Sequence, residues 1–483
     1  MSGALRPPLD LEIAENGYKT PGEDHFVNGG DYFFRGPSSP TVVRRSHRDP
    51  EKTESNPANP FRDPPQTPPP RGPPRNTPSI LVNSQPNPES LARMISNARK
   101  DKCGGKVGIR DRICCFQWTW FTMTMATGGV ANVLYSISSA YDAAWLWYIG
   151  VMFFILNLCL FTTNCILISM RFAMVPGSFM HSFLDQMESL FIPSFVVSIA
   201  TIFINICEYG IPHTGPWLQH TMQWLFWVYI IVSVSASAGM YLILWSTQIF
   251  PIHTMTPVWV FPGYPLLLTA PFAANLIAVD RVAADDPKIH RLAIATCAVT
   301  VQGTGFLISF MICAAFIYRL MTQKLPRDAQ RPGVFISIGP AGFTVCGLVL
   351  LGQQAHDIIP TNFQGEPHVT LILKTLSTLI GLWLWGLSLW FFLISVGSLW
   401  KYVRPERKMP FQMTWWSFVF PNTALVTATL ALSQAIDSSG LKIFGCIVAA
   451  ALIIVWVLVF ATMVHCLWKR ELLWPKDLET ESD

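Results

Sequence analysis

Ten long apolar segments follow one another between about residues 116 and 468, and almost none of them carries a charge near its middle. A helix needs about 20 apolar residues to cross the hydrocarbon core of a bilayer. Within lipid the backbone must satisfy its own hydrogen bonds, so each segment is predicted to be a helix. The chain is therefore predicted to be an all-α integral membrane protein that moves a solute rather than making bonds.

Composition agrees with this prediction. Charged residues are 13% of the 483-residue chain, about half of what a soluble protein carries. Eleven cysteines are scattered without a Cys-x-x-Cys pair, which argues against disulfides and zinc. The net charge of +4 gives no indication of nucleic-acid binding. No cluster of His, Asp or Glu appears at mid-depth, and no nucleotide-binding loop is present, so we expect no enzyme, metal or cofactor.

The chain divides into three parts. Residues 1–100 are polar and proline-rich and are predicted to be a disordered cytoplasmic tail. Residues 101–468 form the membrane domain, and residues 469–483 a short cytoplasmic tail. The predicted helices cover 116–137, 145–170, 189–207, 220–246, 256–279, 291–321, 334–355, 368–400, 412–434 and 440–467.

Topology follows from lysine and arginine, which stay on the cytoplasmic side. The segment before the first helix, the loops after helices 6 and 8, and the C-terminal tail are basic, whereas the loops after helices 1, 3 and 7 contain neither residue. The loop after helix 5 is an exception to this pattern, because it contains Arg281 and Lys288. The balance predicts that both termini are cytoplasmic.

Helix-breaking residues alternate along the chain. Proline removes a backbone donor and frees a carbonyl, which lipid tolerates only where neighbours or a cavity cover it. The odd helices are therefore predicted to form an inner ring and the even helices a lipid-facing layer. The breakers are Gly128 and Gly129 in helix 1, Pro193 in helix 3, Pro262, Pro265 and Pro271 in helix 5, Gly339, Pro340 and Gly342 in helix 7, and Pro421 in helix 9.

Polar residues gather on the same helices. Hydroxyls and amides without mid-depth carboxylates suit an anion better than a cation, although a neutral solute would also fit. Each side chain could instead bond to its own helix, and the glycines could serve tight packing. The predicted substrate path comprises Thr127, Gly128, Gly129, Asn132, Pro265, Asn275, Gly339, Pro340, Thr344, Asn422 and Thr423.

The residues also resemble a known family. The strings TMATGGV in helix 1, RPGVFISIGPAGF before and in helix 7, and FVFPN in helix 9 are similar to those of the fungal malic acid permeases. These belong to the tellurite-resistance/dicarboxylate transporter family, with the plant slow anion channels and the fungal sulfite pumps. The resemblance implies five helical hairpins with the odd helices around a central pore, often as a homotrimer. It also implies a phenylalanine gate, at the position of Phe420.

The resemblance sets the predicted function. ATGGV at 126–130 and FPNT at 420–423 look more like the malate branch than the sulfite pumps. We expect transport of malate, succinate and related C4-dicarboxylates, either passive or proton-coupled. The alternative is a gated anion channel or a sulfite efflux pump of the same fold. Arg331 could steer a dianion at the cytoplasmic mouth or simply report topology, and His356 could couple protons or be a solvated loop residue.

Overall fold

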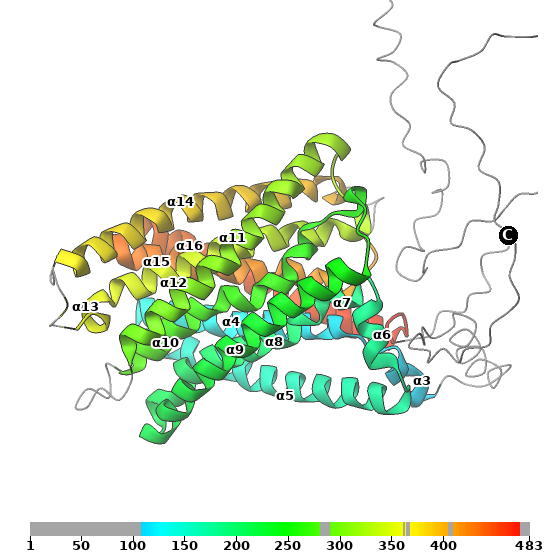
Figure 1. Cartoon of the computed structure of the whole chain (residues 1–483), viewed down its shortest axis with the longest axis horizontal. Coiled ribbons are helices and arrows are strands. Elements are labelled where there is room, and N and C mark those ends of the chain that lie inside the picture. Colours follow the sequence, from blue (N-terminus) through cyan, green and yellow to red (C-terminus); the bar gives the residue numbers. More distant parts are fainter. Residues whose placement is uncertain (1–107, 281–289, 361–362, 364–367, 404–408, 474–483) are drawn as a thin grey trace, which may run out of the picture. The chain divides into compact units, whose positions relative to one another are not determined.

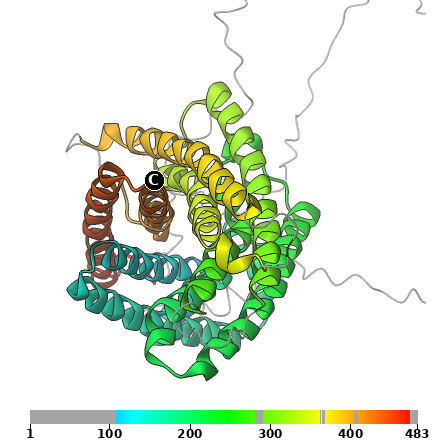
Figure 2. The ribbon, with the colours of Figure 1, turned by 90° about the vertical axis from the view of Figure 1, so that its left-hand side faces the viewer.

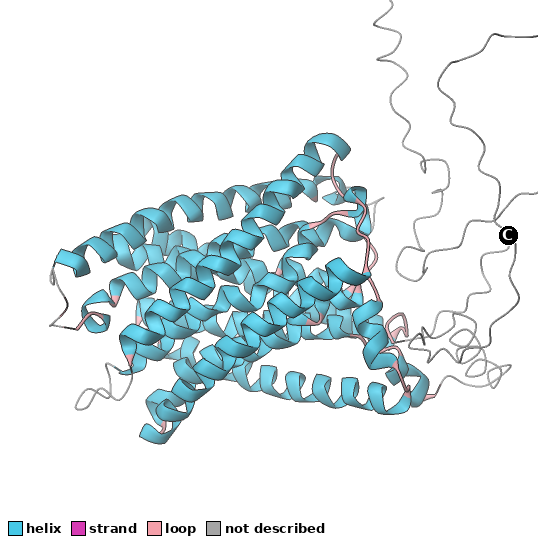
Figure 3. Cartoon of the chain, in the orientation of Figure 1, coloured by secondary structure: helices cyan, strands magenta, loops and turns pink. Residues whose placement is uncertain are grey.

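A computed structural model of the chain describes residues 108–280, 290–360, 363, 368–403 and 409–473. The predicted N-terminal tail at 1–100 lies outside these residues, as does most of the C-terminal tail. In the described ranges the chain is built from helices joined by short connections (Figure 3). The short helices are α3 (Ile109–Cys114), α6 (Ser178–Leu184), η5 (Ile252–Thr254), α13 (Ala355–Ile358) and η8 (Trp400–Val403).

Five helices are long and uninterrupted. They contain 30 to 33 residues each, and no proline lies inside any of them beyond the first position. An apolar helix without a break satisfies its own backbone, which is what a lipid-facing segment requires. We call them the outer helices: α5 (Ala144–Met174), α9 (Pro216–Thr247), α11 (Arg291–Gln323), α14 (His368–Ser398) and α16 (Ser439–Trp468).

The other five segments are interrupted. Four begin with a tight 3₁₀ stretch and then continue as an α-helix, and the remaining one ends in a π-helical turn. We call them the inner helices. They are η2–α4 (Trp118–Trp120, Phe121–Tyr141), α7–α8–η3–η4 (Glu188–Phe191, Pro193–Asn205, Ile206–Gly210, Ile211–His213), η6–α10 (Pro257–Leu268, Thr269–Asp280), η7–α12 (Asp328–Ser337, Ile338–Gln353) and η9–α15 (Met413–Phe418, Phe420–Ile436).

The inner helices form a closed ring, as their contacts show. Helix α4 contacts α8 on one side and α15 on the other, α8 contacts η6–α10, α10 contacts α12, and α12 contacts α15. Each outer helix covers part of this ring: α5 covers α4, α9 and α11 cover η6–α10, α14 covers α12, and α16 covers α15. Figure 1 labels these helices, and Figure 2 shows the bundle nearly end on.

Burial separates the two sets. In the most apolar window of each segment, 72–94% of residues are buried in the inner helices from α8 onward, but only 17–39% in the outer helices. The predicted alternation of inner and outer segments is therefore confirmed. Nine helical segments in the described ranges are long and apolar enough to cross a membrane. Helix α4 is not among them because threonines, serines and glycines lower its hydropathy, so the tenth crossing stays a prediction.

Two details differ from the sequence-based expectation. The first inner segment is not interrupted at Gly128 and Gly129, since α4 runs through both and the 3₁₀ stretch lies earlier, at Trp118–Trp120. The seventh segment begins at Asp328 rather than at residue 334, which places Arg331 inside η7 instead of a loop. In both cases tertiary contacts decide where the helix changes type, and these contacts leave no local mark in the sequence.

Candidate functional site: the centre of the inner ring

Phe420 lies on the face of α15 that points into the ring. Thr423 faces α4, where a Cβ atom on Gly129 would lie 2.8 Å from its Oγ1. Ala424 faces α12, where a Cβ atom on Gly342 would lie 2.8 Å from its carbonyl carbon. Residues three and four apart share a helix face, so Phe420 lies between these two directions. That direction is toward the centre of the ring.

Three aromatic rings meet at this level. The centroid of Phe420 lies 5.1 Å from that of Phe343 in α12 and 5.8 Å from that of Tyr264 in η6. Phe343 and Tyr264 are themselves 6.4 Å apart. Only 2% of Phe420 is exposed. Aromatic side chains from three inner helices therefore pack against one another at the level of Phe420.

Tyrosine hydroxyls satisfy the interrupted backbone around this cluster. Tyr264 donates a hydrogen bond of 2.6 Å to the carbonyl of Ile336. In a regular helix that carbonyl would accept from residue 340, but Pro340 has no N–H. The same Tyr264 hydroxyl packs directly against Gly339, which leaves no room for a side chain there. The break in η7–α12 is therefore covered by protein rather than by solute.

The break in η6 is covered in the same way from outside the ring. Tyr229 of α9 donates to the carbonyl of Pro265 at 2.6 Å, and Tyr241 of α9 donates to the carbonyl of Trp259 at 3.1 Å. A 3₁₀ turn would bond the Trp259 carbonyl to residue 262, which is again a proline. The predicted path residue Pro265 thus has its carbonyl turned toward an outer helix.

A polar layer lies beyond the aromatic cluster, toward the α13 end. Asn132 of α4 is four residues after Gly128, which faces α8, and three after Gly129, which faces α15. It therefore points between those helices and is half-buried, whereas residues 128–131 are buried. Thr427 lies on the inward face of α15 by the same reasoning, with Cys346 of α12 beside it.

Asn275 of α10 is also half-buried, and its side-chain amide donates to the carbonyl of Pro271 at 3.0 Å. Asn422 is buried and donates to the carbonyl of Phe418 at 2.8 Å, while its Oδ1 has no hydrogen-bond partner. The hydroxyl of Thr423 donates to the carbonyl of Phe420 at 2.6 Å. These amides and hydroxyls mostly complete their own helices, as the alternative interpretation expected.

Some predicted path residues face the outer helices instead. Thr127 accepts a hydrogen bond of 3.2 Å from the indole of Trp456 in α16. Thr344 accepts one of 3.0 Å from Gln302 in α11. Gly128 is covered by side chains of α8 and α5, with Thr201 the nearest. The structure therefore places these three positions at contacts between helices, away from the centre of the ring.

The two residues proposed for steering and coupling lie away from the ring centre. Arg331 donates to the carbonyls of Ser398, at 2.6 Å, and of Pro326, at 3.2 Å, and lies 3.5 Å from a carboxylate oxygen of Asp328. With Lys324 it lines a pocket of about 570 Å³. His356 is exposed on α13. The guanidinium of Arg331 is thus held by backbone carbonyls and by Asp328.

Several inward-facing residues of the outer helices were not predicted. The side chain of Gln302 in α11 is fully buried, accepts from the backbone N–H of Ala270 at 3.2 Å, and donates to Thr344. It therefore links the breaks of two inner helices. A sequence signal was available: the buried residues of the outer helices recur at seven-residue spacing, which marks a narrow contact stripe. Examples are Gly150, Asn157, Asn164 and Arg171 in α5, and Gly381, Ser388 and Ser395 in α14.

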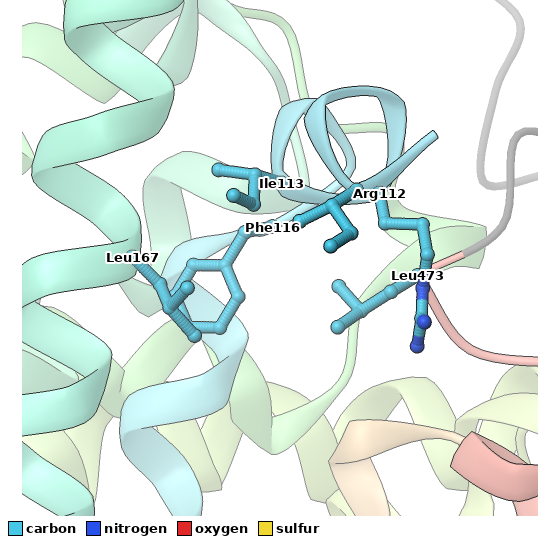
Figure 4. A pocket seen from close by; sticks show the side chains of 6 residues that line it. Arg112, Ile113, Phe116, Leu167 and Leu473 are labelled. Carbon is cyan, nitrogen blue, oxygen red and sulfur yellow. The ribbon is translucent and has the colours of Figure 1, made fainter. Parts of the chain in front are cut away.

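A second pocket lies apart from the ring, between α3 and α5 (Figure 4). It has a volume of about 120 Å³. Figure 4 shows apolar side chains pointing toward one another, with Arg112 at the edge. Its lining is apolar apart from that guanidinium, so it does not continue the polar layer. The lining residues are Ile109, Arg112, Ile113, Phe116, Leu167 and Leu473.

A closed ring of interrupted helices inside uninterrupted membrane helices defines a membrane transport protein with a central path. Comparison with known proteins agrees. Residues 115–464 match the SLAC1 family, described as voltage-dependent anion channels, and the chain belongs to this family.

Three relatives illustrate the range of the family. A malic acid transport protein of Schizosaccharomyces pombe is 28% identical over 371 residues, which cover 76% of this chain and 82% of the relative. A putative malic acid transport protein of the same yeast is 27% identical and covers 78% of this chain and 86% of the relative. A sulfite efflux pump of Trichophyton rubrum is 28% identical and covers 77% of this chain and 97% of the relative.

Proposed function

We propose that this protein transports malate and related C4-dicarboxylates, such as succinate, across the plasma membrane, with both termini in the cytoplasm. The observation that carries the proposal is Phe420 on the inward face of α15, within a cluster of rings that closes the inner ring. A phenylalanine that moves aside would open a narrow path without breaking any hydrogen bond of its side chain. The proposed substrate passes through the ring.

Two features support an anionic substrate. The layer beyond the aromatic cluster offers Asn132, Thr427 and Asn275, which can meet a carboxylate with neutral polar groups. Arg331 and Lys324 line the pocket at the opposite mouth, where their charge would raise the local concentration of a dianion. The relatives' names include both malic acid and sulfite at the same 28% identity, so sulfite efflux is the second candidate.

Uptake into cells that lack their own carriers tests the proposal. Labelled malate, succinate and sulfite are supplied separately across a pH series, with transport compared at equal surface expression. We expect saturable malate and succinate uptake and little sulfite movement. Sulfite movement alone would favour the second candidate. Transport of none of the three would remove the function and leave the fold standing. Currents that do not saturate would identify a channel rather than a carrier.

Thiol labelling tests whether the path is hydrated. In a background without reactive native cysteines, Asn132→Cys should react with a membrane-impermeant thiol reagent. Leu307→Cys in α11 is the matched control, because Leu307 is 59% exposed in the structure and should face lipid. Labelling of Leu307→Cys alone would reverse the assignment of inside and outside. We also propose a homotrimer, which a mass measurement in detergent would test.

A further inference from the structure

Glu208 is a buried charged residue that has no role in the transport path proposed above. Four charged side chains are buried among the described residues. Arg171 and Glu188 form an ion pair, and Arg319 donates to two backbone carbonyls. Glu208 is 2% exposed, and its Oε2 has no hydrogen-bond partner. It lies in the π-helical turn that follows α8.

The surroundings of Glu208 indicate that it faces the interior of the ring. It interacts electrostatically with Tyr135 of α4 and with Cys346 of α12. Helix α12 does not adjoin α8, because η6–α10 separates them on one side and α4 and α15 on the other. An interaction between Glu208 and Cys346 therefore crosses the interior. Asn205 donates to the carbonyl of Gly128 and Tyr209 to that of Ala131, so Glu208 lies at the level of Asn132 and belongs to the polar layer.

The elements packed against this turn supply no counter-charge. Within its own turn, Glu208 has the neutral groups Cys207 and Tyr209 beside it. Helix α8 contains no titratable residue, and α10 contains none before its last residue, Asp280. In η4 the ring of His213 packs on Trp147 of α5 at 5.0 Å. No described residue supplies a cation to an ionised carboxylate at this position, and burying such an unpaired charge is costly, whereas the neutral acid can be accommodated.

The backbone at this point is also unusual. Residues Ile206–Gly210 form a π-helical turn, a feature that is rare and often found at functional sites. Tyr209 points the other way, donating to the carbonyl of Ala131 at 2.7 Å and packing against Gly150 of α5. The turn is therefore anchored through Tyr209 to α4 and α5, while Glu208 is directed elsewhere.

We propose that Glu208 is a proton-binding residue of the path and that its charge controls the passage of organic anions. The inference rests on the proposed function. The protonated acid is neutral and can donate a hydrogen bond to a substrate carboxylate. The ionised form places a negative charge beside Tyr135 and Cys346 that repels the same substrate. One proton is bound from solution and released to it, and no covalent bond changes.

The first test compares pH profiles. Purified protein in liposomes takes up labelled malate at a series of external pH values, and each variant is divided by wild type at the same pH, so that titration of malate itself cancels. Wild-type flux should fall as pH rises, by up to about tenfold per unit above the midpoint for a single site. Glu208→Gln mimics the neutral acid, so its flux relative to wild type should rise with pH.

Glu471→Gln is the matched control, because Glu471 is an exposed carboxylate near the other end of the chain. It should follow wild type throughout. A Glu208→Gln profile identical to wild type would overturn the proposal and leave malate transport standing. Loss of pH dependence in His356→Ala, with Glu208→Gln unchanged, would also overturn it and move proton binding to α13.

A second measurement needs no mutation. A hydrophobic carbodiimide reacts with protonated carboxyl groups in membranes, and mass spectrometry locates the adduct. Glu208 in the wild-type chain should be modified faster at acidic pH, and malate should slow the reaction. Modification at a rate independent of pH, or none at any pH, would contradict the proposal. This result decides the matter even if Glu208→Gln does not fold.

Failure of the proposed malate transport can be distinguished from failure of the proposed role of Glu208. If wild type takes up no malate at any pH, the same comparison is made with nitrate, which stays ionised throughout the series. A pH-dependent nitrate flux that Glu208→Gln no longer shows would support the role of Glu208 and exclude malate. A nitrate flux with the same pH profile in both proteins would remove the role of Glu208.

Discussion

The inner and outer helices of this protein satisfy their backbone polar groups by different means. Each outer helix is a single α-helix of 30 to 33 residues with one continuous α-helical backbone, and most of its surface is exposed in the isolated chain. The inner helices change from 3₁₀ to α geometry, and side chains from other helices complete their hydrogen bonds. Because the inner helices are covered by protein, they can carry breaks that lipid would not tolerate.

The helix contacts and the side chain at the centre of the ring also differ in how tightly they are held. Two outer helices, α5 and α14, contact the ring through a narrow stripe of mostly small or polar residues at seven-residue spacing. The inner helices contact each other so closely that several glycines leave no space for a methyl group. At the centre, by contrast, the apolar side chain of Phe420 packs on the rings of Phe343 and Tyr264 and cannot form a hydrogen bond. A side chain held by dispersion alone can move without loss of a hydrogen bond.

Removing the ring of Phe420 should have the largest effect on function. Phe420→Ala is expected to increase anion leak, because the aromatic cluster loses its inward member, and Phe420→Leu should leak less than Phe420→Ala. The truncation of a buried Phe also costs about 3–5 kcal/mol of stability, so currents are normalised to surface expression. Phe310→Ala on the exposed face of α11 is the control and should leave the current unchanged. Equal currents in Phe420→Ala and wild type would argue against a gate.

A methyl group at an inner contact should destabilise the protein, whereas one on an outer surface should not. A Cβ atom on Gly342 would lie 2.8 Å and 3.0 Å from backbone atoms of Ala424, so Gly342→Ala must push α12 and α15 apart. Such overpacking typically costs about 1–3 kcal/mol. Gly386 of α14 has no atom within 4 Å of the same position, and Gly386→Ala should be neutral or stabilising. Melting temperatures in detergent measure both, and similar values would contradict the close contact.

The next largest effect should come from removing the side-chain amide of Gln302, through which α11 bonds to α10 and α12. Gln302→Leu would leave the buried N–H of Ala270 without an acceptor, at a cost of about 1–3 kcal/mol. Thr300, two residues earlier on the exposed face, bonds only to its own helix, and Thr300→Val should have little effect. Thermal unfolding of the two variants should differ accordingly. A stable Gln302→Leu would mean that the link is dispensable.

Much of this architecture follows from the sequence, because prolines in apolar segments must be covered and uninterrupted segments need not be. The direction of a single side chain does not follow in the same way. Thr127 and Thr344 are on inner helices as predicted, yet their hydroxyls accept hydrogen bonds from outer helices. Successive residues are rotated by about 100°, so knowing which helix holds a residue leaves its direction open until the neighbours are known.

Gln302 and Glu208 differ in how far the sequence predicts their burial. Gln302 lies on the seven-residue stripe of α11, a spacing that is present in the sequence but is independent of the proline pattern. In the sequence, Glu208 is only an acidic residue at the end of an apolar segment. Its burial depends on the π-helical turn and on the placement of α4 and α12. The geometry of that turn comes from packing over long sequence distances, so no local pattern predicts it.

The smallest effect should come from removing one hydroxyl. Tyr264→Phe keeps the aromatic ring beside Phe420 but removes the side-chain donor to the carbonyl of Ile336, which cannot accept the usual α-helical hydrogen bond from Pro340. The expected loss is about 1 kcal/mol. Tyr318→Phe on the exposed face of α11 is the control. If Tyr264→Phe melts with wild type, the hydroxyl of Tyr264 is not needed to satisfy the Ile336 carbonyl, and the break in η7–α12 would not depend on this contact.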